Sequence, residues 1–195
     1  ESNGIPGWVV KYVVCRPKSR PPSGVEFHEP GAKQTLARMI QEVVDLEGPI
    51  HIEIVTARLA RRWNLQRIGD RMMGAVHQAA RQLVAQGSLK RTDKFLWPIQ
   101  EEFVLRVRCP DPEDETSVRK IEFIASEEIE LAITALIREA ISLSEDEVPS
   151  RVARIFGFDR TGRNIQEHLE QTLKKMVTSG ILVRQGDRLS LNSTA

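Results

Sequence analysis

The chain has 195 residues, of which 41% are hydrophobic and 28% are charged, and its formal net charge is +1. This length suits one large domain or two small ones, and the composition is that of soluble globular proteins rather than of disordered chains. No apolar run approaches the length of a membrane-spanning helix and no signal peptide is visible, so we expect a cytoplasmic protein without a membrane partner.

A long internal repeat organises the sequence. Adding 93 to each residue number places residues 55–91 on residues 148–184 without a gap, and 11 of the 37 paired positions are identical. Arg67 and Gly69, for example, recur as Arg160 and Gly162. A repeat of this period means that each copy is a structural unit. We therefore predict two domains, residues 1–98 and 99–195.

Each copy opens on two segments rich in β-branched and aromatic residues, which predict a pair of short strands. Cys15 and Cys109 end the first segment of each pair. We interpret both as small, half-buried apolar residues, because too few other ligands lie nearby for a zinc site or a disulfide framework. The four segments are residues 8–15, 25–28, 103–109 and 121–124.

Helical periodicity predicts three helices after the strands in each copy. The third helix ends at Gly87 or Gly180, and both copies finish with a hairpin whose turn is one residue longer in the second copy. Helix, helix, turn, helix and hairpin is the order of a winged helix-turn-helix. The predicted fold class is therefore α+β and mainly helical, with two tandem winged helix-turn-helix-like units, each preceded by a short strand pair.

Motifs of catalysis are missing from the sequence. It has no phosphate-binding loop, no nucleophile elbow, no His-Glu-x-x-His and no Cys-x-x-Cys. No histidine recurs at an equivalent position, and the acidic run at residues 111–115 has no counterpart in the first copy. We expect no catalytic residue, no cofactor and no metal site.

The near-neutral total charge conceals an asymmetry. Residues 1–98 hold 15 basic and 9 acidic side chains, giving +6, whereas residues 99–195 hold 13 and 18, giving −5. In a winged helix the start of the third helix and the hairpin, or wing, contact phosphates. The candidate nucleic-acid-binding residues are Arg67, Arg71, Arg81, Lys90, Arg91 and Lys94 in the first copy, and Arg160, Arg163, Arg184 and Arg188 in the second. Glu167 and Glu170 on the third helix weaken the case for the second copy.

The repeated Arg-x-Gly also has structural interpretations. Gly69 and Gly162 would permit close packing or a positive φ where the third helix begins. Arg67 and Arg160 would hydrogen-bond carbonyl groups at the end of the second helix. Both interpretations are alternatives to a role in binding.

The sequence resembles a bacterial and archaeal domain of unknown function at the C-terminus of very large superfamily 1 helicase proteins, where it often follows a Vsr-like nuclease domain. The resemblance covers about Tyr12 to Leu191. It implies an accessory module whose partners are DNA and other domains of a larger helicase polypeptide, and it carries over no catalytic residue. The matching stretches are Gly48-Pro49-Ile50-His51, Arg67-x-Gly69-x-Arg71, Phe95-Leu96-Trp97-Pro98 and the weaker Phe158-Asp159-Arg160-Thr161-Gly162.

Two functions follow from these observations. The first is a non-catalytic module that binds or guides DNA for a helicase or nuclease, mainly through the first copy. The alternative is a docking scaffold in which paired winged helices bind another protein or domain, and it is favoured by the acidic second copy. An exposed apolar patch would support docking, and a continuous positive face would support DNA binding.

Overall fold

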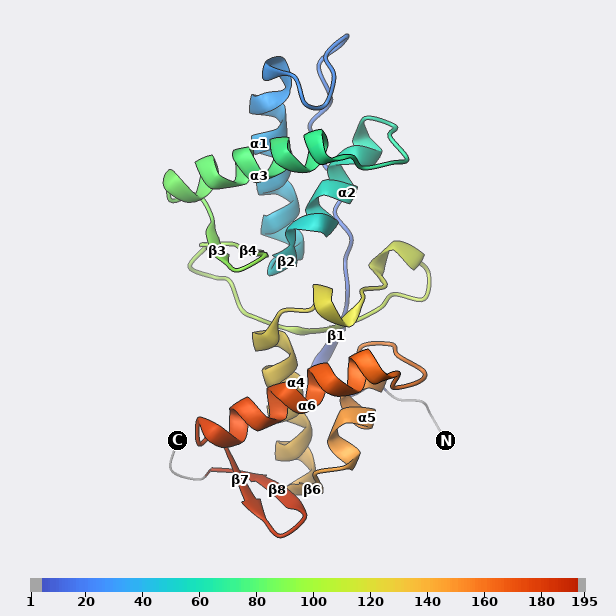
Figure 1. Ribbon diagram of the computed structural model, residues 1–195, viewed down its shortest axis with the longest axis vertical. Coiled ribbons are helices and arrows are strands. Elements are labelled where there is room, and N and C mark those ends of the chain that lie inside the picture. The colour runs from blue at the N-terminus through green and yellow to red at the C-terminus, as the bar shows by residue number, and fades with distance from the viewer. Residues whose placement is uncertain (1–4, 193–195) are drawn as a thin grey trace. The chain divides into compact units, whose positions relative to one another are not determined.

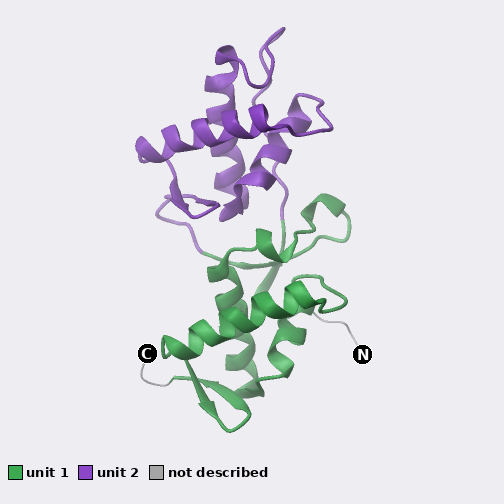
Figure 2. Cartoon of the chain, viewed as in Figure 1, with its two compact units in different colours: residues 1–12, 105–195 green, residues 13–104 purple. Residues whose placement is uncertain are grey.

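The chain folds into two compact units in a computed structural model that describes residues 5–192 (Figure 1). Unit 2 comprises residues 13–104, and unit 1 comprises residues 5–12 together with 105–192 (Figure 2). We expected a single boundary after residue 98. The chain instead passes between the units twice, because its first segment belongs with the second copy of the repeat. No helix in the described range is long and apolar enough to span a membrane.

Three helices and a small antiparallel sheet make up unit 2. A short 3₁₀ turn, η1 (Pro30–Ala32), leads into the helices α1 (Lys33–Glu47), α2 (Ile52–Arg62) and α3 (Asp70–Ala85). The strands are β2 (Ile50–His51), β3 (Lys90–Thr92) and β4 (Phe95–Trp97), in the order β2-β4-β3. The β3–β4 hairpin was expected, whereas the third strand, β2, was not.

Unit 1 repeats this arrangement. Its helices are α4 (Ser126–Ala140), α5 (Glu147–Ile155) and α6 (Arg163–Thr178), preceded by the 3₁₀ turns η2 (Glu115–Ser117) and η3 (Ile121–Phe123). Its strands are β6 (Ser142–Ser144), β7 (Leu182–Gln185) and β8 (Arg188–Leu191), in the order β6-β8-β7. Subtracting 93 places α4 on α1 and α6 on α3 residue for residue. The fold is therefore α+β and mainly helical, as predicted.

The two hairpins share one register. Thr92 lies opposite Phe95 in unit 2, and Gln185 lies opposite Arg188 in unit 1. Each turn therefore has two residues, and the predicted one-residue insertion in the second hairpin is wrong. The consequence is that the counterpart of the basic Lys94 is the acidic Asp187.

The predicted strand pairs differ from the structure. The strand β1 (Val9–Lys11) pairs in parallel with β5 (Val107–Cys109), so the first strands of the two copies pair with each other inside unit 1. Neither predicted second strand is present at residues 25–28 or 121–124. Ile121 and Ile124 are both buried, and their spacing of three residues suits a 3₁₀ turn rather than the alternation of a strand.

The cores follow the predicted apolar faces. All five periodic positions of α1 are buried, and the equivalent face of α4 is buried as well. Amphipathic helices of this kind are stabilised chiefly by packing of the apolar face rather than by helix propensity. The buried positions are Leu36, Met39, Ile40, Val43 and Val44 on α1, and Ile133, Leu136 and Ile137 on α4.

Unit 1 encloses a charged cluster that holds its N-terminal segment. The Glu128 side chain is fully buried, and it accepts hydrogen bonds from Arg119 at 2.8 and 2.9 Å and from Arg108 Nε at 3.2 Å. Both guanidinium groups lie over the Tyr12 ring, 4.5 and 4.9 Å from its centroid. Burial tends to raise the pKa of Glu128, but the two arginines outweigh it and lower that pKa.

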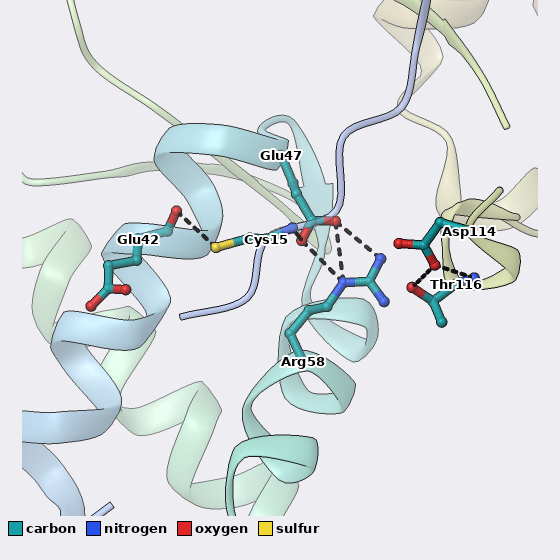
Figure 3. Close-up of polar contacts among 6 residues, drawn as sticks. All are labelled: Cys15, Glu42, Glu47, Arg58, Asp114 and Thr116. Atoms are coloured by element: carbon teal, nitrogen blue, oxygen red, sulfur yellow. Dashed lines mark hydrogen bonds and ion pairs between the residues drawn. The ribbon is translucent and has the colours of Figure 1, made fainter. Parts of the chain in front are cut away.

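Unit 2 has a buried ion pair of its own. Its acid, Glu47, is the last residue of α1, whereas Glu128 lies near the start of α4. Arg58 Nε lies 3.0 Å from Glu47 Oε1, and Nη2 lies 3.1 Å from Oε2 (Figure 3). The backbone N–H of Cys15 donates to the same Oε1 at 2.8 Å. Glu47 therefore ties the segment that enters unit 2 to α1 and α2.

The two cysteine thiols are expected to react slowly in the folded protein. Both are buried and neither forms a disulfide. Burial, followed by the carboxylates of Glu47 and Glu42, raises the pKa of Cys15 to about 11, and burial raises the pKa of Cys109. Since the thiolate is the reactive form, a chromogenic disulfide reagent at mildly alkaline pH should label neither thiol until the protein unfolds. Prompt labelling of single Cys→Ser variants under native conditions would contradict this.

Candidate nucleic-acid interface

The six candidate cations of unit 2 lie along one path from the start of α3 to the hairpin. Arg67 is in the turn between α2 and α3, Arg71 is the second residue of α3, and Arg81 follows about 15 Å further along the helix axis. The hairpin supplies Lys90 and Arg91 from β3, and Lys94 from the turn. Arg91 is half-buried, and the other five side chains are exposed.

Five of these six cations have no internal counter-charge. Within residues 5–192, the side chains of Arg67, Arg71, Arg81, Lys90 and Lys94 form no hydrogen bond or ion pair. Arg91, the sixth, is held by a hydrogen bond from its Nε to the backbone oxygen of Asp93, at 2.7 Å. The charge of this surface, which we call the α3–hairpin surface, is therefore available to a ligand.

His77 connects the helical and hairpin parts of the α3–hairpin surface. It is half-buried on α3, and burial followed by the charges of Arg91 and Arg81 lowers its pKa, against a smaller opposing effect of Glu53. Cations from α3 and from β3 thus act on the same imidazole.

Two of the four candidate cations of unit 1 are paired with carboxylates. Arg163 Nε lies 2.7 Å from Glu167 Oε1, and Arg184 forms an ion pair with Glu145. Arg188 donates at 3.0 Å both to the hydroxyl and to the backbone oxygen of Ser142. Arg160 is exposed and makes no such contact among the described residues. Unlike the cations of the α3–hairpin surface, the candidate cations of unit 1 are therefore partly neutralised within their own unit.

The same surface of unit 1 also carries carboxylates at positions that are neutral or basic in unit 2. Gly74 and His77 correspond to Glu167 and Glu170, and Lys94 corresponds to Asp187. A hollow of about 470 Å³ beside α6 is lined by Glu145, Asp146 and Glu170 as well as by Lys174 and Arg184. Its mixed charge makes it unsuited to a dense polyanion.

The structural interpretations of Arg-x-Gly are not supported. The φ angles of Gly69 and Gly162 are −106° and −67°, and a Cβ atom at either position would meet nothing within 4 Å. Neither glycine is therefore required by close packing or by a positive φ. Arg67 and Arg160 form no hydrogen bond to carbonyl groups at the end of the preceding helix in the described part of the chain.

The units also differ in overall charge by their structural boundaries. Residues 13–104 contain 14 basic and 10 acidic side chains, and the described residues of unit 1 contain 14 and 16. The opposite signs predicted for the two halves are thus retained. The formal net charge is thus +4 for unit 2 and −2 for the described residues of unit 1.

Comparison with known proteins gives one match. A family profile described as a protein of unknown function (DUF3320) matches residues 25–73, which run from the loop before α1 to the first turn of α3. The match includes Arg67, Gly69 and Arg71 but not the hairpin. No curated protein and no solved structure matches the chain. Over these residues the chain is therefore similar to a domain of unknown function.

Proposed function

We propose that the chain is a pair of winged helix-turn-helix units in which unit 2 binds DNA and has no catalytic role. In this proposal α3 is the recognition helix and the β3–β4 hairpin is the wing, as the order of elements in each unit suggests. The observation that carries the proposal is the set of five cations on the α3–hairpin surface without an internal counter-charge. Release of counterions from neutralised phosphates would provide the driving force.

The larger context follows from the resemblance noted above and belongs to the same proposal. A DNA-binding module attached to a helicase or nuclease would hold or orient the strand on which the enzyme acts. The Arg67-x-Gly69-x-Arg71 motif lies inside the matched region, and it provides two of the proposed phosphate contacts. Outward-facing Gln78 and Gln82 are neutral hydrogen-bonding side chains that could reach base edges.

A charge-reversal experiment tests the proposal. We expect the Arg67, Arg71, Lys90 and Arg91 to Glu variant to lose at least about 100-fold in affinity for duplex or forked DNA, measured by fluorescence anisotropy. The matched control reverses the four arginines at 160, 163, 184 and 188 in unit 1, and it should change affinity by less than about threefold. Equal losses in both variants, or a loss in neither, would refute the assignment to unit 2.

DNA binding is expected to strengthen as pH falls, through His77. Its pKa is lowered in the free protein, and phosphates placed beside it would raise that pKa, so binding takes up a proton. Affinity should therefore rise by up to about tenfold between about pH 7.5 and pH 5.5, one pKa unit being equivalent to a factor of ten. His77→Gln should abolish this rise, and an identical pH dependence in that variant would contradict it.

A further inference from the structure

We propose that unit 1 carries a second binding site, a groove for a peptide segment of another protein in which isolated carboxylates alternate with large apolar side chains. The groove has a volume of about 800 Å³. It lies between the outer side of α5, the turn after α5 and the loop that begins at Cys109. The site goes beyond DNA binding by unit 2, because it uses a different unit and a different kind of ligand.

The walls of the groove are apolar and open. Ile5 and Val118 are 55% and 61% exposed, and Ile155 and Phe158 are half-buried beside them. Leu136 of α4 forms a buried part of the lining. Exposed apolar side chains gathered in one concave place indicate a surface that another molecule covers. Because the walls are open, an extended segment suits the groove better than an enclosed small molecule.

Two arginines add a charge requirement. Arg151 and Arg154 stand three residues apart on α5, so they share a face of the helix, and both line the groove. Both are exposed, and within the described chain neither forms an ion pair. The lining contains Asp159 as its single carboxylate, so cations are in excess. Guanidinium groups in this position favour carboxylate ligands, which they can bind through two parallel hydrogen bonds.

Comparison of the two units explains why Arg151 is available. Arg151 is the counterpart of Arg58, whose guanidinium is buried against Glu47 in unit 2. The counterpart of Glu47 is Ala140, so unit 1 lacks the internal acid that neutralises this arginine. The same residue is therefore part of the interior in one unit and part of an open groove in the other. An incoming carboxylate would take the place that Glu47 occupies in unit 2.

The surroundings of the groove disfavour nucleic acid. Pro110 and Pro112 line it, and the same loop carries Asp111, Glu113 and the acids that follow them. A continuous row of phosphates would be repelled by these carboxylates. A peptide segment can instead place a few carboxylates on the arginines and apolar side chains on the walls.

The shape of the groove depends on the turn after α5. Gly157 has a φ of +83°, and a Cβ atom there would lie 2.6 Å from Pro110 Cγ. Glycine therefore allows the turn to approach the 110 loop closely, and both residues line the groove. The asparagine at the equivalent position of unit 2, Asn64, also has a positive φ, of 56°.

The test titrates the whole chain against a short fluorescein-labelled peptide in which leucine and aspartate alternate. We expect saturable binding that weakens at least about tenfold in the Arg151→Glu/Arg154→Glu variant, since each tenfold step corresponds to about 1.4 kcal/mol. Arg138→Glu, an exposed arginine of α4 outside the groove, is the control and should leave affinity unchanged. Peptides with asparagine for aspartate, or with serine for leucine, should each bind at least about tenfold more weakly.

The outcomes separate this site from DNA binding by unit 2. If the proposal holds, the Arg151/Arg154 variant keeps the DNA affinity of the unaltered chain, and a duplex oligonucleotide does not displace the peptide. Undetectable peptide binding, equal binding by the groove variant, or displacement by the oligonucleotide would overturn it. Circular dichroism checks that the variant is folded, and Arg151→Gln/Arg154→Gln provides the milder change if it is not.

Discussion

Replacing Glu128 by alanine is expected to destabilise unit 1 by about 3–5 kcal/mol, the usual effect of removing one partner from a buried ion pair. Arg108 and Arg119 would stay buried without their carboxylate, and Tyr12 would lose the guanidinium groups stacked on its ring. The N-terminal segment should loosen as well, since the same cluster holds it. Chemical denaturation followed by circular dichroism measures the change in the free energy of unfolding.

Glu130→Ala is the matched control for this substitution. Glu130 lies on the same helix and pairs with Lys175 at the surface, at 2.8 Å, so its loss should cost no more than about 1 kcal/mol. If Glu128→Ala were as mild as Glu130→Ala, the buried cluster would not stabilise unit 1.

Unit 1 is also expected to be sensitive to acid through the same carboxylate. The folded-state pKa of Glu128 lies below its ordinary value of 4.5. Its contribution to stability is therefore complete above the unfolded-state pKa and is lost as pH falls through the folded-state pKa. Loss of unit 1 structure in acid should begin at a higher pH in Glu128→Gln than in the unaltered chain, and identical acid unfolding would contradict this.

Transferring the unit 1 charges onto unit 2 is expected to abolish DNA binding. The triple variant Gly74→Glu, His77→Glu and Lys94→Asp reproduces Glu167, Glu170 and Asp187 on the α3–hairpin surface. At about 1 kcal/mol of repulsion for each introduced carboxylate, the affinity should fall at least about 100-fold. A Cβ atom at Gly74 meets nothing within 4 Å, so the larger side chain fits without strain.

A gain-of-function variant in unit 1 provides the reciprocal comparison. Glu167→Gly, Glu170→His and Asp187→Lys remove the acids from its α6–hairpin surface, and in a chain whose unit 2 has been charge-reversed they should restore part of the DNA affinity. Thermal unfolding confirms that each variant is folded. DNA affinity unchanged by the unit 2 triple variant would show that its α3–hairpin surface does not contact DNA.

The helices could be predicted from sequence because their apolar spacing is regular and, at the third helices, a glycine marks the end. Apolar periodicity marks the buried faces, and glycines such as Gly87 and Gly180, with φ of 70° and 76°, mark where the third helices end. Because of the internal repeat, each helix predicted in one copy was supported by an equivalent helix predicted in the other. The pairing of β1 with β5 could not be predicted, because the register of short strands depends on the tertiary packing around them.

The buried acids can be recognised in the sequence, because each stands at an apolar position of its helix, but apolar spacing alone does not explain them. Glu47 continues the apolar spacing of Val43, and Glu128 precedes Ala132 by four residues on the face that α4 buries. An acidic residue at such a position indicates a buried ion pair, but the sequence does not show which arginine forms the pair with it. Arg58 and Arg151 are equivalent in the repeat, yet Arg58 is buried against Glu47 and Arg151 is exposed.

The sequence predicted which cations belong to the candidate DNA surface. It did not predict which of them lack an ion-pair partner within the protein. Sequence alone could not show that Arg163 pairs with Glu167 or that Arg184 pairs with Glu145, because these contacts depend on side-chain geometry. The one-residue insertion predicted in the second hairpin also shifted the alignment there. Lys94 was therefore not recognised as the counterpart of Asp187. The structure sharpens the difference between the units that composition suggested.

The most direct measurement is the salt dependence of DNA affinity for the unaltered chain and for the Arg67, Arg71, Lys90 and Arg91 reversal. If the five available cations each neutralise a phosphate, the logarithm of affinity for duplex DNA should fall against the logarithm of salt concentration with a slope of about −4.5. The slope should shrink towards zero in the reversed variant. A slope near zero in the unaltered chain, or the same steep slope in both proteins, would contradict DNA binding through the α3–hairpin surface.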